Sequence, residues 1–181
     1  MKLTPLKLEG AYLMEPVVHG DHRGFFIERY REDYLREIGS GTFVQDNHSL
    51  SSEIGILRGM HYQLNPKAQT KLVWVLSGEI YDVILDIRRS SPTFGQWLGV
   101  LLSEQNKRQL LVPRGFAHGY CTLAPNTQVL YKVDEYYSPE HDRGILWNDP
   151  ALGIDWPTSQ PILSDKDQRH PLLKDAEMNF E

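Results

Sequence analysis

Between residues 71 and 133 the pattern of hydrophobic and polar residues predicts successive strands. Segment 71–76 (KLVWVL) is apolar, and after a Ser77-Gly78 turn the run 79–87 (EIYDVILDI) continues with alternating faces. A period of two is that of a β-strand. Further strands are expected at the following segments, each bounded by Pro, Gly, Asn or Ser: 95–102, 109–112, 116–122 and 128–133.

Helical patterns are short and lie outside this block. Residues 32–38 (EDYLREI) have apolar spacing for two turns and end at Gly39. A second short helix is expected to start at Ser164 and to run toward Pro171. Many short strands separated by turns indicate a β-sandwich or barrel. The pattern therefore predicts a mainly β protein, a jelly roll with a few short peripheral helices, and residues 1–181 are expected to form a single domain.

Composition narrows the class of protein. The 181 residues are 40% hydrophobic and 24% charged, which is typical of a folded protein. No apolar run approaches the roughly 20 residues of a membrane helix, and the first residues lack the apolar core of a signal peptide, so no membrane association is expected. Cys121 is the only cysteine, which fits a cytoplasmic protein. A net charge of −5 with scattered Lys and Arg argues against nucleic acid as a partner.

Two motifs point to a binding site in the mouth of a barrel. The pattern Pro113-x-Gly115-x-x-His118 resembles the second motif of the cupin superfamily, although it can also be a turn followed by a core histidine. The first cupin motif supplies metal ligands, but here His61 is followed by Gln63, and Lys71 stands where an acidic ligand is expected. An amide and an ammonium are poor ligands for Zn or Fe. A metal-free cupin is therefore expected.

A series of segments runs in order over nearly the whole chain and narrows the resemblance further. These are residues 21–26 (DHRGFF), 43–49 (FVQDNHS), 57–63 (LRGMHYQ), 71–73 (KLV), 91–97 (SPTFGQW), 113–119 (PRGFAHG), 130–132 (LYK), 136–139 (YYSP), 147–150 (WNDP) and 163–167 (LSDKD). Together they resemble the dTDP-4-dehydrorhamnose 3,5-epimerase family. The resemblance implies a homodimer that needs no cofactor and acts on a dTDP-linked 4-keto-6-deoxyhexose.

The implied reaction converts dTDP-4-dehydro-6-deoxy-D-glucose to dTDP-4-dehydro-L-rhamnose. The 4-keto group acidifies the C–H bonds at C3 and C5, so that removing either proton gives an enolate and returning it to the other face inverts the carbon. Such chemistry needs a base, an acid and positive charge near O4. His61 is expected to be the base, because imidazole titrates at about 6.5.

The resemblance assigns the remaining catalytic roles. Asp167 would orient His61, Tyr131 would be the acid, and Lys71 would stabilise the oxyanion at O4. From the residues alone, other interpretations stay open: His61 as a barrel-wall histidine, Asp167 as part of a capping box that begins at Ser164, Tyr131 as strand packing and Lys71 as a solvated lysine.

The resemblance also implies a set of substrate-binding residues. Besides Lys71 these are Arg23, Glu28, Gln45, Asp46, Asn47, Arg58, His118, Asp142 and Lys166. The guanidinium of Arg58 suits a pyrophosphate because its N–H groups can meet two phosphate oxygens. Strict strand alternation puts Arg58 and His61 on opposite faces, so a bulge or twist is expected near Gly59. Trp74 is expected near the mouth of the site, where it would touch the base or the sugar.

Three rival functions remain open at this point. An epimerase acting at C3 alone or at C5 alone would share the same residues. A metal-dependent cupin oxygenase is disfavoured by Gln63, and a non-catalytic nucleotide-sugar binding module is disfavoured by the set of His61, Tyr131 and Asp167. The recipient glycan and the oligomer geometry are not encoded in any recognisable pattern.

Overall fold

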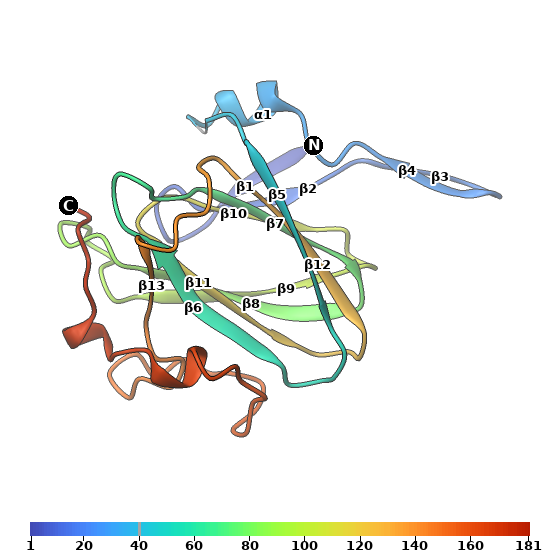
Figure 1. The fold of residues 1–181 in the computed structure, drawn as a ribbon. Coiled ribbons are helices and arrows are strands. Elements are labelled where there is room, and N and C mark those ends of the chain that lie inside the picture. Colours follow the sequence, from blue (N-terminus) through green and yellow to red (C-terminus); the bar gives the residue numbers. More distant parts are fainter. Residues whose placement is uncertain (40) are drawn as a thin grey trace.

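The computed structural model describes residues 1–39 and 41–181. Two antiparallel sheets lie face to face and form the body of the molecule (Figure 1). The first has the order β1 (Lys2–Pro5), β2 (Tyr12–Glu15), β10 (Gln109–Val112), β7 (Lys71–Ser77), β12 (Thr127–Val133) and β5 (Gln45–Ser51). The second has the order β13 (Asp142–Gly144), β6 (Leu57–Gln63), β11 (Phe116–Thr122), β8 (Glu79–Asp86) and β9 (Trp97–Ser103).

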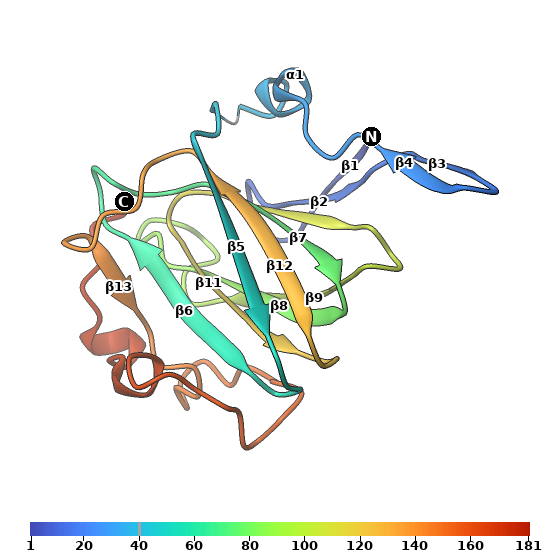
Figure 2. The same ribbon diagram turned by 45° about the vertical axis from the view of Figure 1, so that its right-hand side comes forward.

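The remaining elements are peripheral. A two-stranded hairpin, β3 (Val18–Asp21) and β4 (Gly24–Ile27), projects from the body beside the first sheet (Figure 2). A short helix, α1 (Glu32–Arg36), follows it, and two 3-10 turns, η1 (Asp167–Arg169) and η2 (Leu173–Asp175), lie near the C-terminus. No helix among the described residues is long and apolar enough to span a membrane.

Inward-facing apolar side chains fill the space between the two sheets. Val73 and Val75 of β7 meet Ile80 and Ile84 of β8 and Val129 of β12, and each of these side chains is fully buried. Spacings of two residues on β7 and four on β8 are those of pleated strands with one face in the core. This cluster occupies the interior beside the polar site described below.

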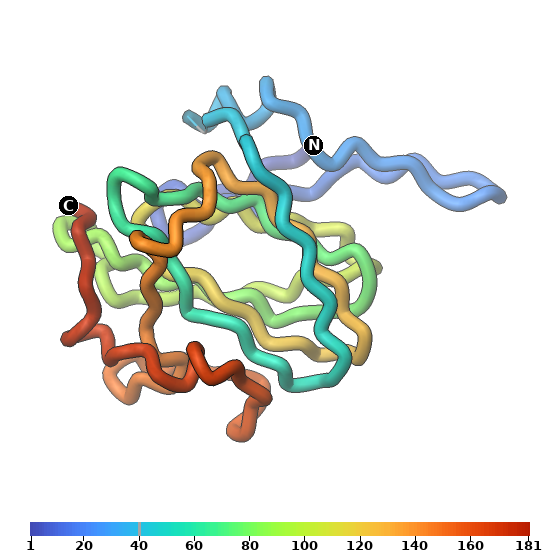
Figure 3. The backbone as a smooth tube through the Cα atoms, in the orientation of Figure 1, coloured from blue at the N-terminus to red at the C-terminus, as the bar shows by residue number. Residues whose placement is uncertain are grey.

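Segments outside the two sheets cover much of the outer face of each sheet. The C-terminal segment, red in Figure 3, passes beneath the second sheet, where Ile145, Trp156 and Phe180 pack on Met60 and Leu85. As a result, the central strands of the two sheets are buried on both faces. Burial on both sides explains why β7 reads as a nearly continuous hydrophobic run.

Trp74 contradicts its predicted position. It lies on the outer face of the first sheet and packs with Leu72, Leu111 and Leu35 of α1. Because Lys71 and Val73 face the interior, the period of two sends Trp74 the other way. Trp74 is therefore a core residue beneath α1 and not part of the site mouth.

The predicted fold class is confirmed. The predicted strands between residues 71 and 133 are also confirmed, and their ends differ from the observed ones by no more than two residues. The helix before Gly39 is also confirmed, although α1 ends at Arg36. The predicted helix from Ser164 is wrong in its extent, since only the single turn η1 forms before Pro171. Pro171 blocks continuation because it disfavours helical geometry at the preceding residue, and His170 is indeed extended.

Candidate active site

Polar side chains replace the apolar core at one end of the space between the sheets. Along β7 the inward positions run from Lys71 to Val73 and Val75, and along β12 from Val129 to Tyr131. Two adjoining cavities of about 120 and 230 Å³ open here, and both are lined by His61, Lys71 and Tyr131. The cavities contain most of the residues predicted from the sequence.

A bulge in β6 brings Arg58 and His61 to one cavity. In the pairing of β6 with β11, His61 lies opposite His118 and Arg58 opposite Tyr120, so three steps on β6 match two on β11. Gly59 has a φ of +129°, and a Cβ atom there would lie 2.5 Å from the Cα atom of Gly119. Only glycine accommodates both conditions. The predicted bulge near Gly59 is thus confirmed.

His61 and Asp167 form a hydrogen-bonded pair. The Nε2 atom of His61 lies 2.5 Å from Oδ1 of Asp167, whose side chain is 5% exposed, while that of His61 is 32% exposed. The carboxylate can only accept, so Nε2 carries the hydrogen and the other ring nitrogen of a neutral imidazole keeps its lone pair. That nitrogen is therefore equipped to take a proton.

Asp167 takes part both in the hydrogen bond that caps the turn η1 and in the pair with His61. Its backbone N–H donates to the hydroxyl of Ser164 at 3.1 Å, as the capping interpretation predicts, while its side chain turns to His61. Burial raises the pKa of Asp167, but the neighbouring imidazoles of His170 and His61 and the hydroxyl of Ser164 outweigh it, so that the pKa lies well below the usual range of a carboxyl group. Asp167 is therefore ionised throughout the neutral range.

Burial is the largest effect on the pKa of His61, and it lowers that pKa. Asp167 opposes the shift because it stabilises the imidazolium, whereas the positive charge of Lys71 and the nearby His170 add to it. The net result is a pKa below the ordinary value. His61 is thus neutral, and able to act as a base, near pH 7.

Lys71 supplies positive charge beside the imidazole. Its side chain is buried, and its Nζ donates to the backbone oxygen of His61 at 3.4 Å. Burial lowers the pKa of Lys71 to about 8, against the attraction of Asp142 and Asp82. The ammonium form therefore still dominates at pH 7, which suits a group that stabilises an oxyanion.

Tyr131 reaches the cavities from the opposite sheet. It lies on β12 of the first sheet, whereas His61 lies on β6 of the second, so the cavities lie between the two side chains. Burial raises the pKa of the Tyr131 phenol, which keeps its proton at neutral pH. A proton donor and a proton acceptor thus face each other across the site.

Several residues in or beside the cavities were not predicted, namely Asp82, Tyr120 and Ser49. The Nε2 atom of His118 lies 2.9 and 3.0 Å from the two carboxylate oxygens of the fully buried Asp82, which orients the ring. The hydroxyl of Tyr120 bonds that of Ser49 at 2.8 Å. Tyr120 and Ser49 stand two residues from His118 and Asn47 on the same strands, so the strand period could have identified them.

Gln63, at the position of a cupin metal ligand, is bound to backbone. Its amide nitrogen donates to the carbonyl oxygens of Lys67 at 2.6 Å and Tyr136 at 3.2 Å, and its Oε1 accepts from the N–H of Ser138 at 2.7 Å. The buried amide therefore holds the loop at 136–138 in place. This use of both amide atoms is consistent with the prediction that Gln63 does not bind a metal.

Among the residues that the structure describes, one cluster brings three potential metal ligands together. Atoms of His61, Asp167 and His170 lie within 4.8 Å of one another. The direct hydrogen bond between His61 and Asp167, however, fills the space that an ion between them would need. We interpret the cluster as an acid–imidazole pair with a second imidazole beside it.

Among the predicted substrate-binding residues, six line the cavities together with Lys71. These are Gln45, Asn47, Arg58, His118, Asp142 and Lys166. Asp142 forms an ion pair with Lys166 and accepts a hydrogen bond from Tyr137 at 3.1 Å, so it organises the rim.

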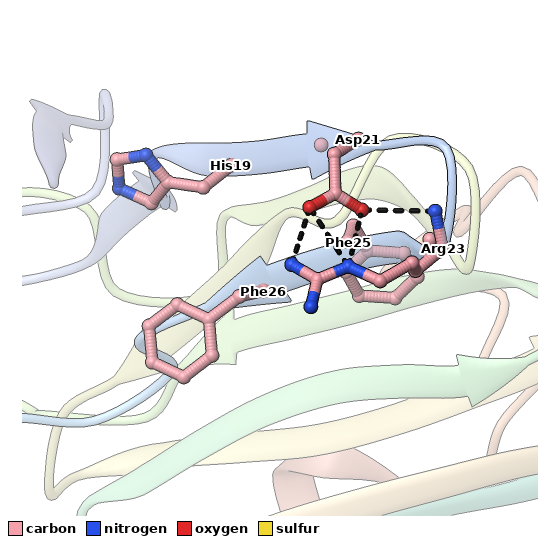
Figure 4. A pocket seen from close by; sticks show the side chains of 7 residues that line it. His19, Asp21, Arg23, Phe25 and Phe26 are labelled. Carbon is pink, nitrogen blue, oxygen red and sulfur yellow. Dashed lines mark hydrogen bonds and ion pairs between the residues drawn. The ribbon is translucent and has the colours of Figure 1, made fainter.

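Three predicted residues are not brought to the cavities within this chain. Asp46 lies on the outer face of β5, where it pairs with Lys132 at 2.7 Å, because its neighbour Asn47 faces inward. Arg23 lies on the projecting hairpin and pairs with Asp21 at 2.5 Å, beside Phe25 (Figure 4). Glu28 follows that hairpin and lies 3.6 Å from Arg31.

The chain is similar to known proteins over nearly its whole length. The model of the dTDP-4-dehydrorhamnose 3,5-epimerase family matches residues 5–175. A dTDP-4-dehydrorhamnose 3,5-epimerase from Salmonella typhimurium is 54% identical over 167 residues, covering 91% of each protein.

Two solved structures have the same fold. The dTDP-4-dehydrorhamnose 3,5-epimerase of Bacillus anthracis, with TDP and PPi bound, is 57% identical, with a TM-score of 0.90 over 94% of this chain and 99% of that one. The dTDP-6-deoxy-D-glucose-3,5-epimerase of Legionella pneumophila, in complex with dTDP-4-keto-L-rhamnose, is 46% identical, with a TM-score of 0.91 over 96% and 93% of the two chains.

Proposed function

The chain belongs to the dTDP-4-dehydrorhamnose 3,5-epimerase family, and on this premise we propose that its two adjoining cavities are the active site, with His61 as the base. The enzyme converts dTDP-4-dehydro-6-deoxy-D-glucose to dTDP-4-dehydro-L-rhamnose. The observation that carries the assignment of the site is the 2.5 Å contact of His61 with Asp167, in cavities that also contain Lys71 and Tyr131.

Proton removal is assigned to the free ring nitrogen of His61. The 4-keto group makes the C3 and C5 protons acidic, and the imidazole takes one of them to give an enolate. Asp167 then faces an imidazolium, and its negative charge stabilises that cation as an acid partner does in a catalytic triad. The low pKa of Asp167 means that it supplies charge and orientation and does not itself take the proton.

Lys71 is assigned to the enolate oxygen. Removal of the C3 or C5 proton shifts negative charge to O4, and a buried ammonium is worth more to that charge than an exposed one because water does not screen it. Lys71 is 8% exposed and lies beside His61. A cation at this place stabilises the transition state of both proton removals.

Tyr131 is assigned as the acid. Inversion requires that the new proton arrive on the face from which the old one did not leave. His61 and Tyr131 come from opposite sheets and line the same cavities, so a sugar ring between them presents one face to each. The raised pKa of Tyr131 ensures that its proton is present when the enolate forms.

The nucleotide half would extend from the sugar along the rim. Arg58 reaches the cavity through the bulge at Gly59 and is suited to the diphosphate. Gln45 and Asn47 offer amides from the inward face of β5, and their side chains are joined by a hydrogen bond of 2.9 Å. Lys166 adds a second positive charge at the rim.

A homodimer would complete this site. The hairpin carries Phe25 and Phe26, which are 57% and 69% exposed, and an apolar pair of this size favours contact with another surface. It also carries Arg23, which does not reach the cavities of its own chain. A second copy whose hairpin lies over the first would cover the phenylalanines and bring Arg23 to the nucleotide.

Other expectations stay predictions. They are the single-domain organisation, the cytoplasmic location, and a reaction that needs neither cofactor nor metal and no partner besides substrate and a second copy.

Product analysis tests the proposed function. The purified protein is incubated with dTDP-4-dehydro-6-deoxy-D-glucose in D2O, and the product is followed by NMR. We expect deuterium at both C3 and C5 and inversion of both centres. Exchange at one carbon only would identify a mono-epimerase, and binding without exchange would identify a binding module. Loss of activity with a chelator would support a metal-dependent enzyme instead.

A further inference from the structure

His170 stands beside the proposed catalytic pair without touching the cavities. It follows the turn η1, and its Nε2 lies 3.4 Å from Oδ1 of Asp167, the same oxygen that binds His61. The side chain of His170 is 9% exposed, and its Nε2 is buried with no hydrogen-bond partner in the structure. A buried imidazole nitrogen pointing at a carboxylate is costly unless the carboxylate serves as its partner.

The fold holds the His170 ring in this orientation. It meets the His61 ring edge-on, with centroids 5.3 Å apart and an interplanar angle of 78°. On its other side lies Gly144 of β13, where a Cβ atom would come within 2.4 to 2.5 Å of three ring atoms. Because only glycine leaves room for the ring there, β13 and η1 together fix where Nε2 points.

We propose that His170 is a positioning residue of the epimerase, which holds the Asp167 carboxylate through its Nε2–H and thereby limits how strongly Asp167 supports the His61 imidazolium. The inference rests on the proposed function, since it assigns His170 to the same proton transfer. It adds a third member to the pair of His61 and Asp167.

The physical reason lies in the shared oxygen. A carboxylate oxygen only accepts, so the contact is favourable when Nε2 of His170 carries the hydrogen. A second donor draws electron density from Oδ1 and weakens its attraction for the imidazolium of His61. Separately, the charge of His170 acts in the same direction on the pKa of His61, after burial and Lys71. A base kept neutral at lower pH stays active there.

Other charged groups surround the cluster and remain unchanged when His170 is replaced. Lys71 faces it from β7, and the groups that line the outer side of His170 come from β13, η1, the two residues before η1 and the C-terminal segment. They are Asp142, Arg143, Asp165, Lys166, Arg169 and Glu177. A matched pair of variants at position 170 therefore isolates the effect of the N–H donor that His170 offers to Asp167.

The test compares His170→Gln with His170→Met. Gln and Met have similar shape, but only Gln can offer an N–H near the place of Nε2. We measure kcat and KM as functions of pH, the pKa of His61 by NMR titration of its imidazole, and the thermal stability of each variant. All assays are repeated with excess EDTA.

In His170→Met the pKa of His61 rises, so the acid limb of kcat/KM moves to higher pH by about half a unit, or roughly threefold in rate on that limb. At the plateau kcat falls about three- to tenfold because the carboxylate is less firmly oriented, while KM is unchanged. His170→Gln restores kcat to within about twofold of the wild type and returns the acid limb toward its position.

An acid limb and a His61 titration in His170→Met identical to those of the wild type would overturn the proposal, because His170 would then only fill space. Equal loss in Gln and Met variants would overturn it as well, as would an EDTA-dependent profile, which would make the cluster a metal site. If the wild type fails to turn over, the proposed function fails, but the NMR titration still decides the role of His170.

Discussion

The barrel interior and the projecting hairpin both carry residues that the family resemblance assigns to the substrate, yet the structure treats them in opposite ways. In the interior, His61, Lys71 and Tyr131 converge from two sheets on adjoining cavities. On the hairpin, Arg23 pairs with its neighbour Asp21 and faces solvent beside exposed phenylalanines. The residues to which we assign the chemistry thus lie together within one chain, whereas Arg23, which the resemblance assigns to the substrate, does not reach these cavities.

The difference shows how pairing within a sheet determines where the side chains of a strand point. Interior residues are placed by the pleat, since every second side chain of a paired strand points between the sheets. Hairpin residues have no such constraint, because β3 and β4 pair only with each other. Their role depends on a second surface, and the following experiments separate the two kinds of residue.

Asp167→Asn should give the largest effect. The amide can donate a hydrogen to Nε2 of His61, which favours the tautomer that leaves the other nitrogen protonated and unable to act as a base. We expect kcat to fall by about 10³- to 10⁴-fold with KM little changed. Steady-state kinetics on a folded variant check this. A loss below tenfold would mean that His61 does not depend on Asp167.

Lys71→Met should lower kcat by about 10²- to 10³-fold, as removal of an oxyanion-stabilising group does. The pH profile sharpens the assignment. Burial lowers the pKa of Lys71 to about 8, so its positive charge is present below that pH and is lost as the pH rises through it. The kcat/KM of the wild type should therefore fall above about pH 8.

The basic limb tests which group is responsible. Lys71→Arg keeps the charge to high pH, so its remaining activity should show no decline near pH 8. A limb that persists in Lys71→Arg would assign it to another group and contradict the role of Lys71.

Arg23→Ala tests the hairpin. If a second copy delivers Arg23, its loss should raise KM roughly tenfold, in keeping with a lost charge-assisted contact, without a comparable change in kcat. Mixing then discriminates between chains. When Arg23→Ala and His61→Asn chains are unfolded and refolded together, half of the dimers are mixed and each mixed dimer has one intact site, so about a quarter of the sites are intact.

At low substrate concentration this mixture should exceed the activity expected from the two variants refolded separately and then combined. Equal activity in both preparations would mean that Arg23 does not act across a dimer. Size-exclusion chromatography of Phe25→Ser/Phe26→Ser, which should shift toward the monomer, provides an independent measure of the same contact.

The smallest effect distinguishes two neighbours on β5. Asn47 lines a cavity, so Asn47→Ala should raise KM about five- to tenfold. Asp46 faces outward and pairs with Lys132, so Asp46→Ala should change KM by less than about twofold, as exposed ion pairs contribute little. A larger loss from Asp46→Ala than from Asn47→Ala would contradict the observed faces of β5.

Much of the interior was predictable because it follows local rules. The strands from 71 to 133 follow from apolar or alternating runs bounded by turn residues, and the bulge at Gly59 follows from the need to bring Arg58 and His61 to one face. The same rule, applied to Lys71 and Val73, would have placed Trp74 on the outer face. That error arose from its proximity in sequence to a site residue.

Other features depend on contacts between distant segments. His170 meets Asp167 and Gly144 only because the C-terminal chain returns to β6 and β13, and no local pattern encodes that return. Asp82 likewise becomes the partner of His118 through the pairing of β8 with β11. For Asp167, capping and catalysis were posed as alternatives, although backbone and side chain of one residue can serve both.

Exchange of substrate protons with solvent tests the central claim that His61 is the base. Wild type, His61→Asn and Tyr131→Phe are each incubated with dTDP-4-dehydro-6-deoxy-D-glucose in D2O, and deuterium at C3 and C5 is followed by NMR. We predict exchange at both carbons in the wild type, largely retained exchange with impaired inversion, especially at C5, in Tyr131→Phe, and in His61→Asn a loss of exchange by at least about 10²-fold. Exchange by His61→Asn at the wild-type rate would contradict the account.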